Sequence, residues 1–292
     1  MPLGASREHL VKAGESGMAD QDMDWAKADA DYVPLEIDTT KPSVARVYDA
    51  VLGGKDNFAV DRAVAAQSMK AMGDEGRGAR LNREVLGRAV RYMVGQGIDQ
   101  FLDLGSGLPT ASNTHQIAQA VNPAALVVYV DNDPSVRIHG HALLADNAST
   151  IVVLADIRQP DTIVRRPEIT GFLDFTKPIG LILNAVIHHI SDEEDPYALV
   201  SAYKAALAPG SYMQLTHFSN ASPEAHAMEQ VFQHALGSGK ARSREEITSF
   251  FDGLEIIEPG VVFIPEWRPD DAVAYPLDLG GLMMLCGVGR KP

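Results

Sequence analysis

The order of apolar and polar residues divides the chain into three stretches. Residues 1–40 are polar and acidic without a sustained hydrophobic period, which is typical of a flexible tail or of an arm that orders against the body. In residues 41–98, apolar side chains recur every three or four positions, the spacing of helices. Residues 99–292 alternate short apolar runs with segments of helical spacing. The pattern therefore predicts a tail, a helical cap segment and one larger domain.

The cap segment predicts three helices. Between Pro42 and Gly53, apolar residues fall at i, i+3, i+4 and i+7, which marks one face of a first helix. Two further helices are expected over residues 58–72 and 79–95. The segment is thus helical throughout, and the strands begin only after it.

Five apolar runs follow from residue 101. They read FLDLG, LVVYVDND, TIVVLAD, PIGLILNA and SYMQLTHF, and segments with helical spacing such as HQIAQAV lie between most of them. Strands of this kind alternating with helices predict a parallel sheet covered on both faces, the doubly wound, Rossmann-like α/β class. The last runs, LEIIEPGVVFIPEW and GGLMMLCGVGRK, lack a crossover helix between them, so we expect antiparallel strands at the end of the sheet.

Composition and charge narrow the range of partners. The chain has 292 residues, with 39 Asp and Glu against 25 Lys and Arg and a net charge of −14. A broad phosphate-neutralising surface, and with it a nucleic-acid partner, is not expected. No stretch approaches the roughly 20 apolar residues of a membrane span, and the single Cys286 suits a reducing compartment. We expect a cytoplasmic protein without a membrane partner, in which Cys286 is a buried, inert thiol; the sequence assigns no oligomeric state.

Polar or small residues follow each of the first four predicted strands. In open α/β sheets, ligands bind beyond the carboxyl ends of the strands, next to the first one. In chain order, the residues at these ends are Asp103, Gly105, Ser106 and Gly107; Asp131 and Asn132; Asp156 and Ile157; and Asn184 and Ala185. They are the predicted ligand-binding residues.

The glycine turn in FLDLGSGLPT is compatible with more than one cofactor. Its glycines allow a tight turn and a close approach of the ligand to the backbone. A nicotinamide dinucleotide needs a third small residue three positions after the second glycine, where this chain has Thr110, preceded by Pro109. Asp131 suits the ribose hydroxyls of an adenosine, and Asp156 suits the adenine amino group. An adenosine cofactor other than a dinucleotide is favoured; a plain strand-to-helix turn and a nicotinamide-dependent oxidoreductase are the alternatives.

Four motifs resemble those of a known class of enzyme. DLGSGLPT, VVYVDNDP, LADIRQP and LILNAVIHHI are similar, in order, to the cofactor-binding motifs of class I S-adenosylmethionine-dependent methyltransferases. The chain resembles still more closely a bacterial family described as an S-adenosyl methyltransferase domain of unknown function. That family has the same front segment, PSVARVYDAVLGGKDNFAVDR, and the same closing EWRPD and GVGRKP. The resemblance covers roughly residues 40–292.

The resemblance implies that S-adenosylmethionine is the cofactor and gives each strand-end residue a role. It sets Asp103, Gly105, Ser106 and Gly107 along the methionine part, Asp131 and Asn132 at the ribose, Asp156 and Ile157 around the adenine, and Asn184 and Ala185 at the sulfonium. Many members of the class carry a third glycine where this chain has Pro109. The cofactor carboxylate also needs a cation, for which Arg46, Lys55 and Arg83 are the candidates.

Catalytic residues are less clearly marked. Methyl transfer from a sulfonium mainly requires alignment, and a general base is needed only when the acceptor must lose a proton. The candidates are His188 after the fourth strand, and Tyr48 and Asn57 in the front segment. In GGKDNF, Asp56 or Asn57 caps the next helix, or the front segment folds over the strand ends as a lid, and the two interpretations are compatible. We predict no metal site, since the acidic run 192–195 near His188 is typical of a helix N-terminus.

The sequence therefore predicts an S-adenosylmethionine-dependent methyltransferase with a small-molecule acceptor. The alternative is a protein that binds S-adenosylmethionine or S-adenosylhomocysteine without turnover, as a sensor or interaction module.

Overall fold

The structure is a computed structural model that describes residues 37–292 except 110–111 and 144–146. These residues belong to one of the two units into which the chain divides, Glu36–Pro292. Most of the predicted tail, and Thr110 in the glycine turn, lie outside the described residues.

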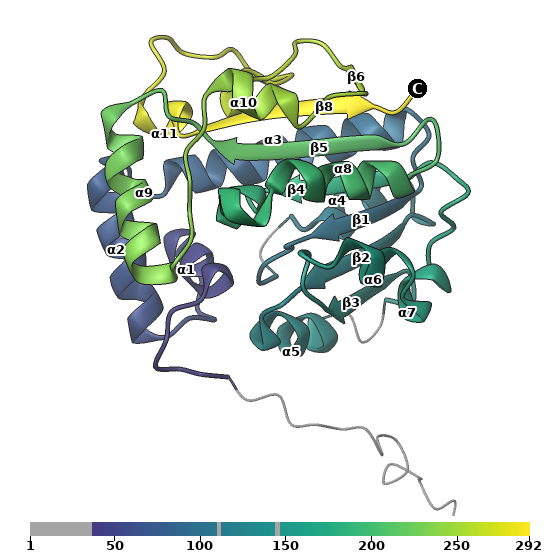
Figure 1. The fold of residues 1–292 in the computed structure, drawn as a ribbon, viewed down its shortest axis with the longest axis horizontal. Helices are drawn as coiled ribbons and strands as arrows, with labels where there is room; N and C mark the ends of the chain where they lie inside the picture. Colours follow the sequence, from purple (N-terminus) through teal and green to yellow (C-terminus); the bar gives the residue numbers. More distant parts are fainter. Residues whose placement is uncertain (1–36, 110–111, 144–146) are drawn as a thin grey trace, which may run out of the picture. The chain divides into compact units, whose positions relative to one another are not determined.

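Three helices precede the sheet, as the periodicity predicts: α1 (Val44–Val51), α2 (Ala59–Met72) and α3 (Arg77–Gly95). They do not form one layer. Helix α3 packs on strands of the sheet, and this packing fully buries its apolar stripe, which includes Val85 and Met93. Helices α1 and α2 pack on each other, and α2 packs on the later helix α9 (Pro223–Leu236). Figure 1 shows α1, α2 and α9 together, beside the end of the sheet to which the β5 arrow points.

The strands form one mixed sheet with the order β3-β2-β1-β4-β5-β8-β6, and β7 pairs with β8. They are β1 (Gln100–Leu104), β2 (Leu126–Asp131), β3 (Thr150–Leu154), β4 (Gly180–Asn184), β5 (Tyr212–Phe218), β6 (Glu255–Ile256), β7 (Val262–Phe263) and β8 (Met284–Arg290). The first five are parallel to one another, and β8 runs antiparallel to β5. Both the parallel sheet and its antiparallel closure are confirmed.

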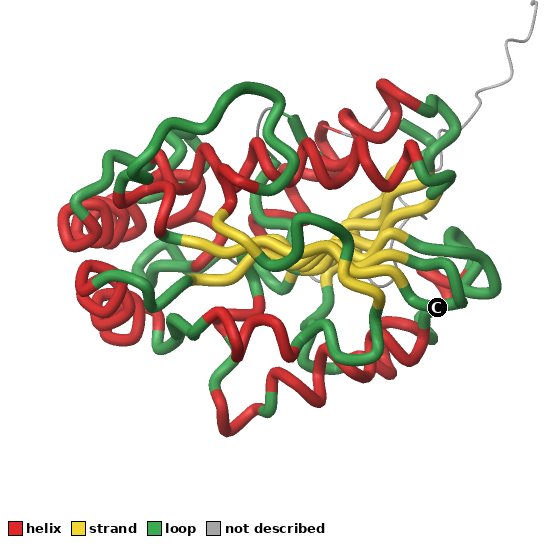
Figure 2. Tube along the Cα trace, turned by 90° about the horizontal axis from the view of Figure 1, so that it is seen from above, coloured by secondary structure: helices red, strands yellow, loops and turns green. Residues whose placement is uncertain are grey.

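Helices cover both faces of this sheet, as Figure 2 shows. The remaining helices are α4 (Thr114–Val121), α5 (Pro134–Leu143), α6 (Pro160–Val164), α7 (Pro167–Thr170), α8 (Pro196–Ala206), α10 (Arg244–Ser249), α11 (Leu279–Leu282) and the short 3-10 helices η1 (Ile187–His189), η2 (Asp192–Glu194) and η3 (Ile264–Glu266). Adjacent residues of β1, such as Phe101 and Leu102, enter different apolar clusters, because side chains of a strand alternate between its faces. Two cores therefore hold the sheet between its helical layers.

The register brings the carboxyl ends of the strands to one edge. Asp103 lies opposite Tyr129 and Ile182, Asp131 opposite Leu154, and Asn184 opposite Thr216. The chain leaves β1 for β2 on one side and reaches β4 on the other, so the order reverses at β1. A crevice is expected at that point of an open sheet.

Two further sequence expectations concern burial. Cys286 on β8 is buried, and burial raises the pKa of its thiol to about 12, as expected for an inert core side chain. Across the part of the chain that the structure describes, no helix has both the length and the apolar character needed to span a membrane.

Candidate active site

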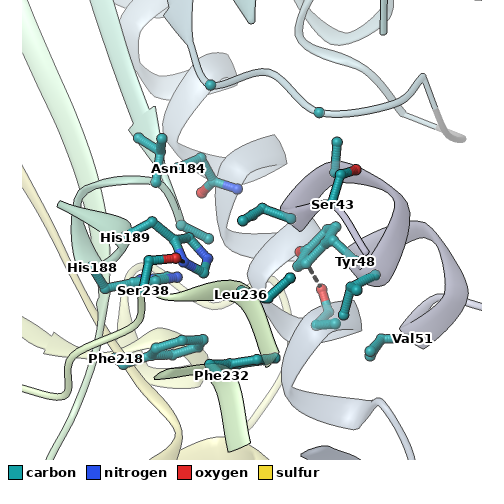
Figure 3. Close-up of a pocket in the computed structure, with 18 of the residues that line it drawn as sticks. Ser43, Tyr48, Val51, Asn184, His188, His189, Phe218, Phe232, Leu236 and Ser238 are labelled. Carbon is teal, nitrogen blue, oxygen red and sulfur yellow. Dashed lines mark hydrogen bonds between the residues drawn. The ribbon is translucent and has the colours of Figure 1, made fainter. Parts of the chain in front are cut away.

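A cavity of about 420 Å³ lies at the carboxyl ends of the parallel strands. Its size is within the range of small-molecule sites. All ten residues predicted to bind the cofactor line it: Asp103, Gly105, Ser106, Gly107, Asp131, Asn132, Asp156, Ile157, Asn184 and Ala185. Helices α1, α2, α3 and α9 supply much of the remaining wall, part of which Figure 3 shows. The fold thus brings one set of strand-end residues and one set of helical residues to the same cavity.

The turn after β1 combines a tight backbone with open space. Gly105 and Gly107 have φ values of +69° and +67°, which favour glycine. A Cβ on Gly105 would lie 2.2 Å from Val186 Cγ2, whereas a Cβ on Gly107 would meet no atom within 4 Å. Ser106 Oγ is buried and has no hydrogen-bond partner among the described residues. A ligand therefore finds free space at Gly107 and an unsatisfied hydroxyl beside it.

Two buried carboxyls flank this turn. Asp131 accepts hydrogen bonds from the backbone N–H groups of Gly107 (2.8 Å) and Asp133 (2.9 Å), one on each oxygen. Asp103 accepts one from Thr114 Oγ1 at 2.6 Å. Burial raises the pKa of both carboxyls to about 6. Because each carboxylate oxygen of Asp131 keeps a second lone pair, two ligand hydroxyls can still bind there.

After β3, the structure shows an arginine that pairs with two carboxylates, an arrangement that the sequence did not predict. Arg158 Nη1 lies 3.1 Å from Asp156 Oδ2, and Arg158 Nε lies 2.7 Å from Glu194 Oε1. All three residues line the cavity beside Ile157. The carboxylate expected to meet an adenine amino group is therefore already partnered by a cation. The arginine two positions after Asp156 in LADIRQP was the sequence signal that could have predicted this pairing.

The turn after β4 is held by side chains of β5. Asn184 Oδ1 accepts hydrogen bonds from Gln214 Nε2 (3.1 Å) and Thr216 Oγ1 (3.2 Å). Ala185 has a φ of +59°, unusual for a residue with a Cβ, and its N–H donates to Thr216 Oγ1 at 2.8 Å. With Oδ1 occupied, the Nδ2 group of Asn184, which bonds to none of the described residues, is the donor that this turn offers to the cavity.

Of the three candidate cations, only Arg83 lines the cavity. Its Nη2 donates to the Ser112 carbonyl at 2.8 Å, while its Nε is buried without a partner in the described chain. Its positive charge lowers the pKa of Asp103, against the larger effect of burial. Lys55 is exposed elsewhere, and Arg46 is used by the cap itself. Arg83 is therefore the cation in place for a ligand carboxylate.

Arg46 and Ser43 attach the first helix to the end of β2. Ser43 Oγ donates to Asp133 Oδ2, and Arg46 Nη1 lies 3.7 Å from the same oxygen. Arg46 Nε also pairs with Asp61 Oδ2 at 3.0 Å, and the side chains of Arg46, Asp61 and Asp133 are almost fully buried. The motifs PSVAR and YVDNDP thus meet in space. We call Ser43, Arg46, Asp61 and Asp133 the cap lock.

The GGKDNF turn has a structural explanation. Asn57 does not line the cavity; its Nδ2 donates to Asp49 Oδ2 (2.8 Å) and to the Gly54 carbonyl (3.0 Å). A Cβ on Gly54 would lie 2.0 Å from Asp49 Oδ1, so the turn needs glycine there. Helix α2 begins after Phe58, and Asp61 accepts the Phe58 N–H at 2.8 Å. The interpretation that Asp56 or Asn57 caps this helix was wrong, because Phe58 is the N-cap, the Asn57 side chain binds Asp49 and the Asp56 carboxylate pairs with His139.

Tyr48 lines the cavity, but its hydroxyl is occupied. It donates to the Ala79 carbonyl at 3.1 Å and accepts from Asn82 Nδ2 at 3.0 Å. Burial raises the pKa of this phenol. Tyr48 therefore joins α1 to α3 and has no free proton-accepting role in this arrangement.

His188 also lines the cavity and is the catalytic candidate with a free ring nitrogen. Its ring stacks on Phe218 with centroids 3.6 Å apart, and only 1% of the residue is exposed. Its Nδ1 is buried without a hydrogen-bond partner in the described structure. Burial, with the charges of His189 and His217, sets the pKa of His188 well below its ordinary value. The imidazole is neutral at pH 7.

A hydrogen-bonded network lies beside His188, whose ring centroid is 5.5 Å from that of His217. His217 Nδ1 donates to the Phe218 carbonyl (2.9 Å), so its Nε2 accepts from Arg242 Nη1 (2.8 Å). Arg242 Nη2 in turn lies 2.6 Å from Asp192 Oδ1. Burial lowers the pKa of His217 to about 3. The sequence does not predict this network, because Arg242 lies in a turn much later in the chain than His217.

Sheet order, glycine turn and strand-end acid together define a class I methyltransferase fold. The model of the S-adenosyl methyltransferase family matches residues 31–292, and the chain belongs to that family. A crystal structure of a candidate methyltransferase from Thermobifida fusca YX is 46% identical, with a TM-score of 0.84, covering 86% of this chain and 95% of that one. A DUF574 family protein from Streptomyces avermitilis MA-4680 is 35% identical, with a TM-score of 0.84, covering 88% and 100%. The comparison with curated proteins found no match.

The family uses S-adenosylmethionine, and the residues present fit this cofactor. The unsatisfied Ser106 hydroxyl and the open space at Gly107 suit its methionine part. The remaining lone pairs of Asp131 suit two ribose hydroxyls. Arg83 supplies a cation where the glycine turn has none.

Proposed function

We propose that this protein transfers the methyl group of S-adenosylmethionine to a small molecule held in the same cavity. The observation that carries the proposal is the continuity of the cavity. It runs from the strand ends, where the predicted cofactor residues lie, to walls formed by α1, α2 and α9. An acceptor enclosed between these helices is small, and the net charge of −14 also argues against a nucleic acid.

The proposed roles follow from the contacts described above. Bound S-adenosylmethionine supplies a methyl group on a cationic sulfur that becomes neutral when the methyl leaves. Asp131 and Arg83 hold the two ends of the ligand that carry hydroxyls and a carboxylate. The turn at Asn184, fixed by Thr216, sets the position of the reacting centre. Catalysis then consists mainly of alignment.

The cap lock supports a closed site. Because Ser43 and Arg46 bind Asp133, two residues after Asp131, helix α1 is attached directly to the predicted ribose end. This attachment supports the lid function expected from the front segment. We also infer a cytoplasmic location, which the single, buried Cys286 supports.

The first test is ligand binding, measured by thermal unfolding with S-adenosylmethionine, S-adenosylhomocysteine or NAD. We expect the first two to raise the melting temperature, because a ligand of the native state stabilises it by mass action. A shift with NAD alone would refute the proposal. Release of S-adenosylhomocysteine in the presence of a small-metabolite extract then separates an enzyme from a protein that only binds.

A further inference from the structure

The end of the cavity under the cap is apolar. Its wall includes Val51 from α1, Met72 from α2, Met228, Phe232 and Leu236 from α9, and Phe218 from β5. Figure 3 shows Phe218 beneath the histidines and Val51 on the opposite side, with Phe232 and Leu236 between them. Flexible methionines and flat aromatic rings suit an apolar ligand with a planar part.

The charged side chains of the cavity lie away from the apolar end or already have partners. Asp103 lies on β1, where the charge of Arg83 from α3 lowers its pKa, and Arg158 after β3 pairs with Asp156 and Glu194. Asp74 lies nearer the cap, but its oxygens accept the N–H groups of Arg77 (2.9 Å) and Gly78 (2.8 Å) at the start of α3. Within the described wall, this end offers no free cation for a carboxylate ligand, and the two N–H groups at the start of α3 already offset the charge of Asp74.

One polar group in this wall has no partner. His188 lies on the Phe218 ring, and among the described residues neither of its ring nitrogens has a hydrogen-bond partner. Its neighbours differ: His189 Nδ1 bonds to Ser238 Oγ at 3.0 Å, and His217 is bonded at both nitrogens. A neutral imidazole offers one bare nitrogen to a hydroxyl proton. A buried polar group of this kind calls for a ligand partner.

We propose that the methyl acceptor is an uncharged, largely apolar molecule that presents a phenolic hydroxyl to His188. This inference rests on the proposed function. Phenols are favoured over aliphatic alcohols because a phenolic proton, with an ordinary pKa near 10, is more easily lost to a weak base. The phenolic oxygen forms a bond to the methyl carbon, and the carbon–sulfur bond breaks with its electron pair remaining on sulfur. The hydroxyl proton passes to His188 and then to solvent.

The test compares three probes of matched size in the presence of saturating S-adenosylhomocysteine. They are 4-propylphenol, the anion 4-propylbenzoate and the cation 4-propylbenzylamine, and their dissociation constants are measured by calorimetry. We expect the phenol to bind at least about tenfold more tightly than either ion, because an unpaired charge is costly to bury. Equal or tighter binding of an ion would overturn the inference.

A pair of opposite substitutions at one position sharpens the test. Leu236 is half-buried at the end of α9, so Leu236→Lys and Leu236→Asp should fold. For an uncharged acceptor, both weaken 4-propylphenol binding several-fold and leave S-adenosylhomocysteine binding unchanged. If the Lys variant gains affinity for the benzoate, or the Asp variant for the amine, above that of the wild-type chain for the phenol, the acceptor class is wrong.

His188→Phe keeps the stacking on Phe218 and removes both nitrogens. We expect about a tenfold loss of affinity for 4-propylphenol and no loss for 4-propylanisole, which has no hydroxyl proton. Equal effects on the two would show that His188 only fills space. Retained S-adenosylhomocysteine binding reports a folded site, and its absence from the wild-type protein would instead contradict the proposed function.

Discussion

At the scale of single residues, Asp131 has a structural role and a proposed ligand-binding role. It closes the glycine turn through the N–H groups of Gly107 and Asp133, and it is the acid expected to accept the ribose hydroxyls. Replacing it with Ala should weaken S-adenosylhomocysteine binding by about a hundredfold or more, since it removes two hydrogen bonds to a charged group that contribute about 1.5–3 kcal/mol each. Calorimetric titration measures this change. Asp161→Ala, an exposed acid on α6, is the matched control and should bind normally.

The same residue predicts how binding depends on pH. Burial raises the pKa of Asp131 to about 6, so the carboxyl takes up a proton as the pH falls through 6. A protonated carboxyl accepts hydroxyl protons less well, and affinity for S-adenosylhomocysteine should therefore decrease between pH 7 and pH 5. Binding near pH 6 should release protons, detectable as a dependence of the binding heat on the buffer. If Asp131→Asn keeps the full pH dependence, another group is responsible.

At the scale of elements, the cap lock decides where α1 lies. Ser43→Ala removes both the N-cap of α1 and the hydrogen bond to Asp133. We expect the free energy of unfolding to fall by about 1–2 kcal/mol. Hydrogen exchange should become faster than in the wild-type protein, and more so in α1 than in α3. Ser149→Ala is a suitable control, because no hydrogen bond to that hydroxyl is seen among the described residues. Unchanged exchange in α1 would show that other contacts hold the cap.

At the scale of the whole molecule, two kinds of buried ionisable group have opposite effects on the free energy of unfolding in acid. The pKa values of His188, His189 and His217 lie below 6.5, with His189 at about 4 and His217 at about 3, mainly through burial. The unfolded chain therefore binds protons below pH 6.5 that the folded chain does not, which reduces stability as the pH falls. Asp103 and Asp131, raised to about 6, keep protons in the folded state and act against this loss.

Because three histidines outnumber two carboxyls, these five groups together predict a net loss. Near pH 5, unfolding takes up about three protons at the histidines and releases about two from the carboxyls, a net uptake of about one proton. The free energy of unfolding should therefore fall by about 1.4 kcal/mol per pH unit between pH 6.5 and 4.5. Denaturation by urea across this range measures the slope. Asp103→Asn removes one opposing group and should make the loss steeper. A stability that rises as the pH falls would contradict the assignment.

The sequence by itself determined the sheet, its antiparallel closure, the first three helices and the set of strand-end residues. Apolar periodicity reports burial directly, and parallel strands bring their ends to one edge whatever the loops do. Only the tertiary structure separated Arg83 from Arg46 and Lys55, showed Asn57 held by Asp49, and joined Ser43 to Asp133. These contacts link side chains 8 to 90 positions apart, or depend on which direction a side chain takes from its helix. Local patterns contain no record of such pairings, so the cap lock and the apolar end of the cavity emerge only once the chain is folded.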